Sequence, residues 1–277
     1  AGNVGTENTG TMIGDTIAPY IDTVNIYNQD EDSFSSVADA KTVIVTASVT
    51  DTNSAIIDNT DVTANLRDLG FGVLVSADSY NQASAIATWT LSGTSVSTNG
   101  TLTVTVGVRD DAGNASTENT GTIIGDTVSP IVSTINVYNQ TLDTYETVAN
   151  GSTVVVTSAI TDTNSNIMDL NDVTANFSEL GFGLVTSSNS YDQSTAMATW
   201  TLAGVSVSSD GLLTVTVGAR DDAGNKSAEN TGSIIGDNVA PEVVTISVVN
   251  LSTGSFTYIK NGDTAVVTLT ISDSNKG

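Results

Sequence analysis

The chain repeats itself every 111 residues. The run Asp-Asp-Ala-Gly-Asn at 110–114 returns at 221–225, and Pro19 returns as Pro130 and Pro241 without an insertion or deletion. This period is longer than the roughly 20–50 residues of solenoid repeats, and it is a usual size for an independent domain. The sequence therefore predicts a tandem array of whole domains rather than one fold built around a single pocket.

Each repeat carries strand signals and no sustained helical periodicity. Residues 101–108 alternate threonine and glycine with leucine and valine, the period of two that is typical of a half-buried strand. Seven short strands separated by turn signals favour an all-β, immunoglobulin-like sandwich with almost no helix, and Trp89 and Trp200 are expected in its core. The expected strands of the first repeat lie near 20–28, 42–50, 61–67, 71–77, 84–91, 101–109 and 115–124.

A short motif, Gly-Asp followed by three residues and proline, marks the start of each domain. Proline cannot donate to a strand ladder and restricts the residue before it, so it suits the entry to a first strand after a short link. Links of a few residues leave little freedom between neighbours. The predicted division is 1–15 as the last strand of a preceding repeat, 16–126 and 127–237 as complete immunoglobulin-like domains, and 238–277 as the first strands of a following, incomplete repeat.

The charge balance argues against several classes of function. The chain has 31 acidic and 7 basic residues and no histidine or cysteine. A net charge of −24 disfavours nucleic acid and anionic membranes as partners, and no apolar run is long enough for membrane insertion. Only carboxylate pairs in exposed turns could act as acid and base, so we expect no enzyme. The acidity itself has two interpretations: carboxylates gathered for divalent cations, or adaptation to a high-salt environment.

The acidic residues suggest a calcium site at each domain junction. In an immunoglobulin-type sandwich the incoming link and two of the loops meet at one pole, and calcium prefers six to eight oxygen ligands on such loops. The alternative is that these aspartates and asparagines are ordinary turn residues. The candidate ligands are Asp15, Asp51, Asn53, Asp58, Asp61, Asp110, Asp111 and Asn114 in the first repeat, Asp126, Asp162, Asn164, Asp169, Asp172, Asp221, Asp222 and Asn225 in the second, and Asp237, Asp273 and Asn275 in the third.

One further acidic stretch gives a different prediction. Asp30-Glu31-Asp32 becomes Thr141-Leu142-Asp143 in the next repeat. Because two of the three charges do not recur, we interpret this stretch as a solvent-exposed loop.

The motifs together resemble a known class of repeats. The opening Asp-x-x-Ala/Ser-Pro, the strand that ends in Asp-Thr-Asn-Ser and the run Thr-Val-x-Val-x-x-Arg-Asp-Asp-Ala-Gly-Asn are similar to bacterial and archaeal immunoglobulin-like tandem repeats of large surface adhesins and surface-layer proteins. The resemblance implies a non-enzymatic, extracellular segment of a cell-surface stalk, layer or filament, with Ca²⁺ between domains. Its partners would be neighbouring repeats of the same chain, with lateral self-association in a filament or lattice left open. The alternative is a recognition module that binds a glycan or a host surface through exposed loops.

Overall fold

The structure, a computed structural model, describes residues 10, 12, 14–52, 58–164, 170–185 and 187–273. Within this part of the chain the secondary structure consists of β-strands and three single 3₁₀ turns, which confirms the all-β prediction. The turns are η1 (Arg67–Leu69), η2 (Leu170–Asp172) and η3 (Ser178–Leu180). None of the helical turns in the described ranges is long or apolar enough to cross a membrane.

The chain divides into two compact units. The first comprises Ala1–Pro130 together with Asp162–Met168 and Arg220–Lys226, and the second comprises Ile131–Thr161, Asp169–Ala219 and Ser227–Gly277. Residues 162–164 and the turn Arg220–Lys226, which the sequence period assigns to the second repeat, thus group with the first unit. The domain limits 16–126 and 127–237 stay predictions.

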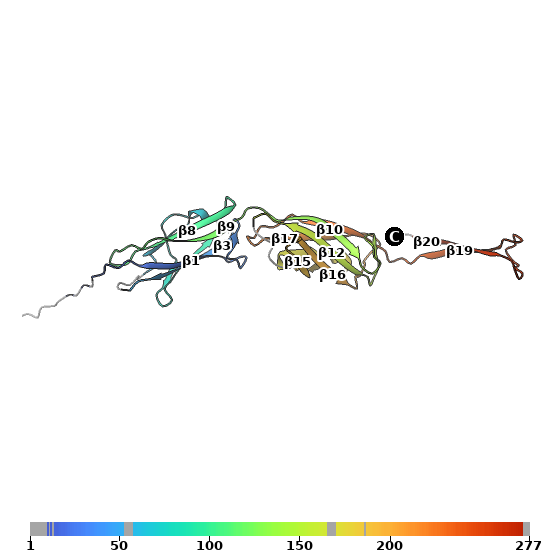
Figure 1. The fold of residues 1–277 in the computed structure, drawn as a ribbon, viewed down its shortest axis with the longest axis horizontal. Helices are drawn as coiled ribbons and strands as arrows, with labels where there is room; N and C mark the ends of the chain where they lie inside the picture. The colour runs from blue at the N-terminus through green and yellow to red at the C-terminus, as the bar shows by residue number, and fades with distance from the viewer. Residues whose placement is uncertain are drawn as a thin grey trace, which may run out of the picture. The chain divides into compact units, whose positions relative to one another are not determined.

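The strands of the first unit form two sheets (Figure 1). One sheet has the order β1 (Tyr20–Asn28), β3 (Thr42–Thr50), β7 (Ile86–Ser92) and β6 (Ser79–Asn81). The other has the order β2 (Ser36–Val37), β9 (Asn119–Gly125), β8 (Gly100–Val108), β4 (Val62–Asn65) and β5 (Val75–Ser76). All neighbours are antiparallel except β2 and β9, which run parallel. Their inner faces share one apolar cluster, so the unit is a β-sandwich.

Alternation along the strands produces that core. In β3 the residues Val43, Val45, Ala47 and Val49 are buried, while the alternating residues Ile44, Thr46 and Ser48 are half-buried on the opposite face of the strand. Trp89 on β7 is also fully buried, and its Nε1 donates to the carbonyl of Val75 at 3.0 Å. The predicted core position of Trp89 is confirmed, because its indole N–H finds a partner inside the sandwich.

The parallel pair β2–β9 holds the end of the last strand of the sandwich against the short strand that follows β1. Ile124 N–H donates to the carbonyl of Ser35, and Asp126 N–H donates to the carbonyl of Val37, both at 3.0 Å. The link residue Asp126 is therefore fixed by backbone hydrogen bonding to the segment that contains β2.

The second unit repeats this arrangement. Its sheets are β10 (Ile131–Asn139), β12 (Thr153–Thr161), β16 (Met197–Ala203) and β15 (Ser190–Asp192), and β11 (Thr147–Val148), β18 (Asn230–Gly236), β17 (Gly211–Ala219), β13 (Val173–Asn176) and β14 (Leu184–Val185). Trp200 lies in this core, as predicted, and packs edge-to-face on Phe177 with ring centroids 5.7 Å apart.

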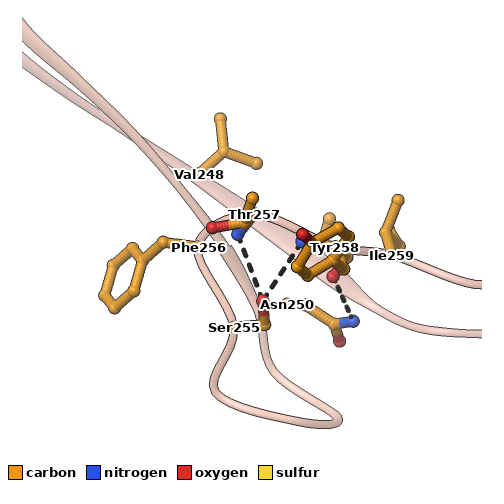
Figure 2. A pocket seen from close by; sticks show the side chains of 8 residues that line it. Val248, Asn250, Ser255, Phe256, Thr257, Tyr258 and Ile259 are labelled. Atoms are coloured by element: carbon orange, nitrogen blue, oxygen red, sulfur yellow. Dashed lines mark hydrogen bonds between the residues drawn. The ribbon is translucent and has the colours of Figure 1, made fainter.

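A two-stranded hairpin, β19 (Glu242–Asn250) with β20 (Ala265–Ser272), completes the second unit. Figure 2 shows Val248, Asn250 and Tyr258 around a hollow near its tip. At the matching positions of the first unit Ile26, Asn28 and Ser36 are buried, and Ile26 belongs to the apolar cluster between the sheets. The hollow therefore lies on the side of the hairpin that corresponds to the buried face of the first unit, and Val248 and Tyr258 are exposed there.

One predicted strand is largely wrong. The expected strand at 71–77 shrinks to β5, Val75–Ser76. The chain leaves η1 through Gly70 at φ 89°, and Leu74, inside the expected strand, takes φ 56°. The left-handed backbone at both residues keeps 71–74 from forming an extended strand.

Candidate metal centres

Two groups of three aspartates bring carboxylate oxygens together. Asp15, Asp51 and Asp110 form one group, and Asp126, Asp162 and Asp221 form the other. Within each group one oxygen from each residue lies within 4.8 Å of the others. In both groups the residues come from the link, from the end of β3 or β12, and from the end of β8 or β17. All three residues of the second group belong to the first compact unit.

The local sequence builds the turn that carries Asp110. Gly113, at φ 92°, donates its N–H to the carbonyl of Asp110 at 3.0 Å, which closes a tight turn. Asn114 then donates its N–H to Asp110 Oδ1 at 2.8 Å and its Nδ2 to Asp110 Oδ2 at 2.9 Å. Its Nδ2 also reaches the backbone oxygen of Asp15 at 3.4 Å, so one asparagine joins the link to the turn.

The turn that carries Asp221 uses the same contacts. Gly224 and Asn225 donate their N–H groups to Asp221 Oδ1 at 2.7 and 2.8 Å. Asn225 Nδ2 donates to Asp221 Oδ2 at 2.9 Å and to the backbone oxygen of Asp126 at 3.2 Å. Asparagine at this position therefore orients the link and the acidic turn, and its amide nitrogen faces them.

Asp126 is a carboxylate of the second group with one uncompensated oxygen. Its side chain is fully buried, and Oδ1 accepts the N–H of Val128 at 2.8 Å. Oδ2 is buried and has no hydrogen-bond donor within reach in the part of the chain that the structure describes. A buried carboxylate oxygen without a donor is costly unless a proton or a cation neutralises it.

The electrostatics of Asp221 also favour neutralisation of the second group by a proton or a cation. Burial raises the pKa of the Asp221 carboxyl above its usual value, and the nearby charge of Asp126 raises it further. The hydrogen bonds from Asn225 and Gly224 lower the pKa and offset part of this effect. Three carboxylates around one point form a hard-oxygen donor set, which fits Ca²⁺ better than a soft metal.

Other predicted ligands lie outside these two groups. Asp58 accepts hydrogen bonds from Thr60 N–H and Oγ1 at 2.7 and 2.6 Å, which lower its pKa, and its own N–H donates to Asp61 Oδ2. This is a closed local turn. Outside the two groups also lie Asp111, Asp172, Asp222, Asp237 and Asp273. Asn164 donates its N–H to Asp162 Oδ1 of the second group at 3.0 Å. Asn53, Asp169 and Asn275 fall outside the described residues.

The prediction for Glu31 is wrong. Its side chain is only 9% exposed and pairs with two cations, Lys41 Nζ at Oε1 and Arg220 Nη1 at Oε2, both at 2.8 Å. All three residues belong to the first compact unit. No signal in the sequence indicates this cluster, because Arg220 lies 189 residues from Glu31.

No protein-family model and no curated protein matches the chain. Among solved structures it is similar to the fibronectin(III)-like modules of Clostridium thermocellum CbhA, at 13% identity over 79% of this chain and 94% of that one, with a TM-score of 0.38. It is also similar to a 1.5-MDa bacterial ice-binding adhesin, at 19% identity over 86% and 71% of the two chains, with a TM-score of 0.43. A tetra-tandem repeat from the extending region of a large adhesion protein is 18% identical over 95% and 66%, with a TM-score of 0.29. At such scores the function has to come from this chain's own residues.

Proposed function

We propose that this chain is a non-enzymatic structural segment of an extracellular, cell-surface protein of the adhesin-stalk, surface-layer or filament type. In this proposal Ca²⁺ binds where a link enters a sandwich and stiffens the array. The repeated sandwich supports the structural role, since two complete copies with the same sheets provide length and spacing.

The observation that carries the calcium proposal is the buried Oδ2 of Asp126, which has no donor among the described residues. Asp126, Asp162 and Asp221 would hold the ion, and Asp15, Asp51 and Asp110 would hold a second one. The calcium would neutralise carboxylates that burial leaves uncompensated. Because it would bind the link residue and two loop residues at once, it would restrict the link.

The expected gain in stability follows from mass action. A ligand that binds only the folded chain stabilises it by about 4 kcal/mol per site when its free concentration is a thousand times Kd. An extracellular protein in millimolar calcium would reach this regime with sites of micromolar Kd.

Isothermal titration calorimetry of the whole chain tests the proposal. We expect two calcium sites, and Asp126→Asn should remove one of them while circular dichroism stays unchanged. Asp111→Asn is the matched control, because Asp111 is exposed and lies outside both groups. Failure to bind calcium at millimolar concentrations, or an equal loss with Asp111→Asn, would contradict the proposal.

A recognition role is the second candidate, and one observation favours it. Tyr27, near the end of β1, pairs with Phe34 of the following loop, with ring centroids 4.7 Å apart. Phe34 is 66% exposed, and Tyr27 Oη donates to Asp32 Oδ1 at 2.7 Å. A matching pair, Tyr138 with Tyr145, lies 4.9 Å apart in the second unit. An exposed ring beside a carboxylate suits a sugar, so a glycan should bind the wild type and not Phe34→Ala with Tyr145→Ala if this role is correct.

A further inference from the structure

Two Asn-Gly pairs of the complete repeats stand where the other repeat has an aspartate. Asn99 matches Asp210, and Asn150 matches Asp39, at the period of 111 residues. Both asparagines are exposed. An asparagine followed by glycine is especially prone to deamidation, because glycine has no Cβ to block the approach of its nitrogen to the asparagine side chain. The matching aspartates indicate that the fold accepts the product of that reaction at both places.

The side chain of Asn99 acts only as a hydrogen-bond acceptor. Thr127 N–H donates to Asn99 Oδ1 at 2.8 Å, and in the second repeat Asn238 N–H donates to Asp210 Oδ1 at the same distance. In the part of the chain that the structure describes, Asn99 donates no hydrogen bond from Nδ2. A carboxylate in place of the amide would therefore keep the bond that ties residue 99 to Thr127.

The surroundings of Asn99 also favour the reaction. Its Oδ1 accepts a second hydrogen bond, from Thr127 Oγ1 at 2.8 Å. In deamidation the backbone nitrogen of Gly100 attacks Cγ of Asn99, and negative charge develops on Oδ1. Two donors aimed at that oxygen stabilise the charge, as an oxyanion hole does. Gly100 has φ 122°, and an added Cβ there would meet nothing within 4 Å, so water reaches the reacting atoms.

Asn150 lacks the second donor. Among the described residues its Oδ1 accepts only the N–H of Val207, at 2.7 Å. An added Cβ on Gly151 would also meet nothing within 4 Å, so the two sites differ mainly in the donors to Oδ1. Asn150 is therefore an internal reference for the intrinsic reactivity of an Asn-Gly pair in this chain.

We propose that Asn99 is a site of spontaneous deamidation and that the fold activates it through Thr127. The Gly100 nitrogen loses its proton to hydroxide and bonds to Cγ, and the side-chain nitrogen leaves as ammonia with a proton from water. One water molecule then opens the succinimide ring, to aspartate at the side-chain carbonyl or to isoaspartate at the main-chain carbonyl. The modification goes beyond the proposed structural role, since it adds a carboxylate that binds the residue next to the link residue Asp126.

Peptide mapping by mass spectrometry tests this inference on the whole chain, incubated at mildly alkaline pH. A deamidated peptide gains the mass that exchange of NH₂ for OH adds. We expect Asn99 to react faster than Asn150 in the folded chain. The two rates should become nearly equal in urea, where the hydrogen bonds to Oδ1 are lost. Thr127→Val should slow the reaction of Asn99 about fivefold, the effect of one hydrogen bond, and leave Asn150 unchanged.

Thr127→Ser is the matched control, because it keeps the hydroxyl and should keep the wild-type rate at Asn99. Asn99→Asp should unfold at the wild-type temperature, since Asp210 makes the equivalent bond in the second repeat. Equal rates at Asn99 and Asn150 in the folded chain would overturn the activation, as would a rate that Thr127→Val leaves unchanged. A clear fall in Tm for Asn99→Asp would overturn the claim that the fold accepts the product.

Discussion

Arg220 donates from Nη1 to Oε2 of Glu31 at 2.8 Å, although 189 residues of sequence separate them. Glu31 binds Lys41 with its other oxygen, so one nearly buried carboxylate joins a loop after β1, the start of β3 and the turn after β17. The turn that carries Asp221 is therefore fastened on one side by ion pairs and on the other by backbone hydrogen bonds.

We expect Glu31→Gln to loosen this turn. Arg220 is 46% exposed, so its share is screened by solvent, but Lys41 at 18% exposure would lose its partner in a poorly hydrated position. The free energy of unfolding should fall by about 1–2 kcal/mol in urea titrations. Leu142→Gln, at the matching position of the second repeat, should change it by less than about 0.5 kcal/mol. Equal effects would show that the Glu31 ion pairs add no stability.

A comparison of two glycines tests how closely the turn 221–225 packs on Lys41 and Glu31. Gly113→Ala and Gly224→Ala both force alanine into positive φ, at 92° and 101°, at a cost of about 1 kcal/mol. Only the alanine at 224 would also displace Lys41 and Glu31. Thermal unfolding should therefore show a larger loss for Gly224→Ala, and adding Lys41→Ala should narrow the difference. A larger loss of thermal stability for Gly113→Ala would contradict the close packing of the turn 221–225 on Lys41 and Glu31.

Calcium and ionic strength should act differently on stability. Millimolar CaCl₂ should raise Tm and EDTA should reverse the rise, because coordination adds binding free energy to the folded state alone. NaCl at matched ionic strength should have a smaller effect, since screening acts on all carboxylates alike. Equal effects of the two salts would favour the high-salt interpretation of the net charge of −24.

The raised pKa of Asp221 predicts the sign of the pH dependence in EDTA. The folded chain holds this proton more tightly than the unfolded chain does, so ionised Asp221 lowers the free energy of unfolding at neutral pH. The lost free energy of unfolding should be recovered as the pH falls through the raised pKa of Asp221 and the carboxyl takes up its proton. With calcium bound the sign reverses, because protons compete with the ion. Asp221→Asn should remove both dependences in chemical unfolding measured at several pH values, and their persistence in this variant would assign them to other groups.

The sequence predicted the fold because the inner and outer faces of the strands alternate. The strands expected at 20–28 and 42–50 agree with β1 and β3 at both ends. Alternation runs through the whole of β3, whereas in β1 a register shift between Ile21 and Val24 interrupts it. The two-residue strand β2 is too short to show a period, and it pairs with β9, far away in the sequence. Which short segments join a sheet depends on such distant partners rather than on local pattern.

For the candidate site, the topology of a sandwich explains what was predictable. It brings the link and two loops to one pole, and the structure gathers Asp15, Asp51 and Asp110 there. It does not tell a gathered aspartate from one that closes a local turn, as Asp58 does with Thr60. Whether the gathered carboxylates bind a metal stays a prediction. Glu31 was misjudged because Arg220, its cation, lies in the other repeat.

The parallel pairing of β2 with β9 has a consequence for a chain under tension. A pull applied at Tyr20 and at Gly125 drags β9 along its own direction, past a strand that runs the same way. The two hydrogen bonds that Ile124 and Asp126 donate are then loaded in shear at the same moment rather than peeled open in turn. Ile235 and Asp237 repeat this clamp in the next sandwich, with bonds to Glu146 and Val148. Each sandwich should therefore yield to force abruptly, at a threshold, rather than by gradual extension.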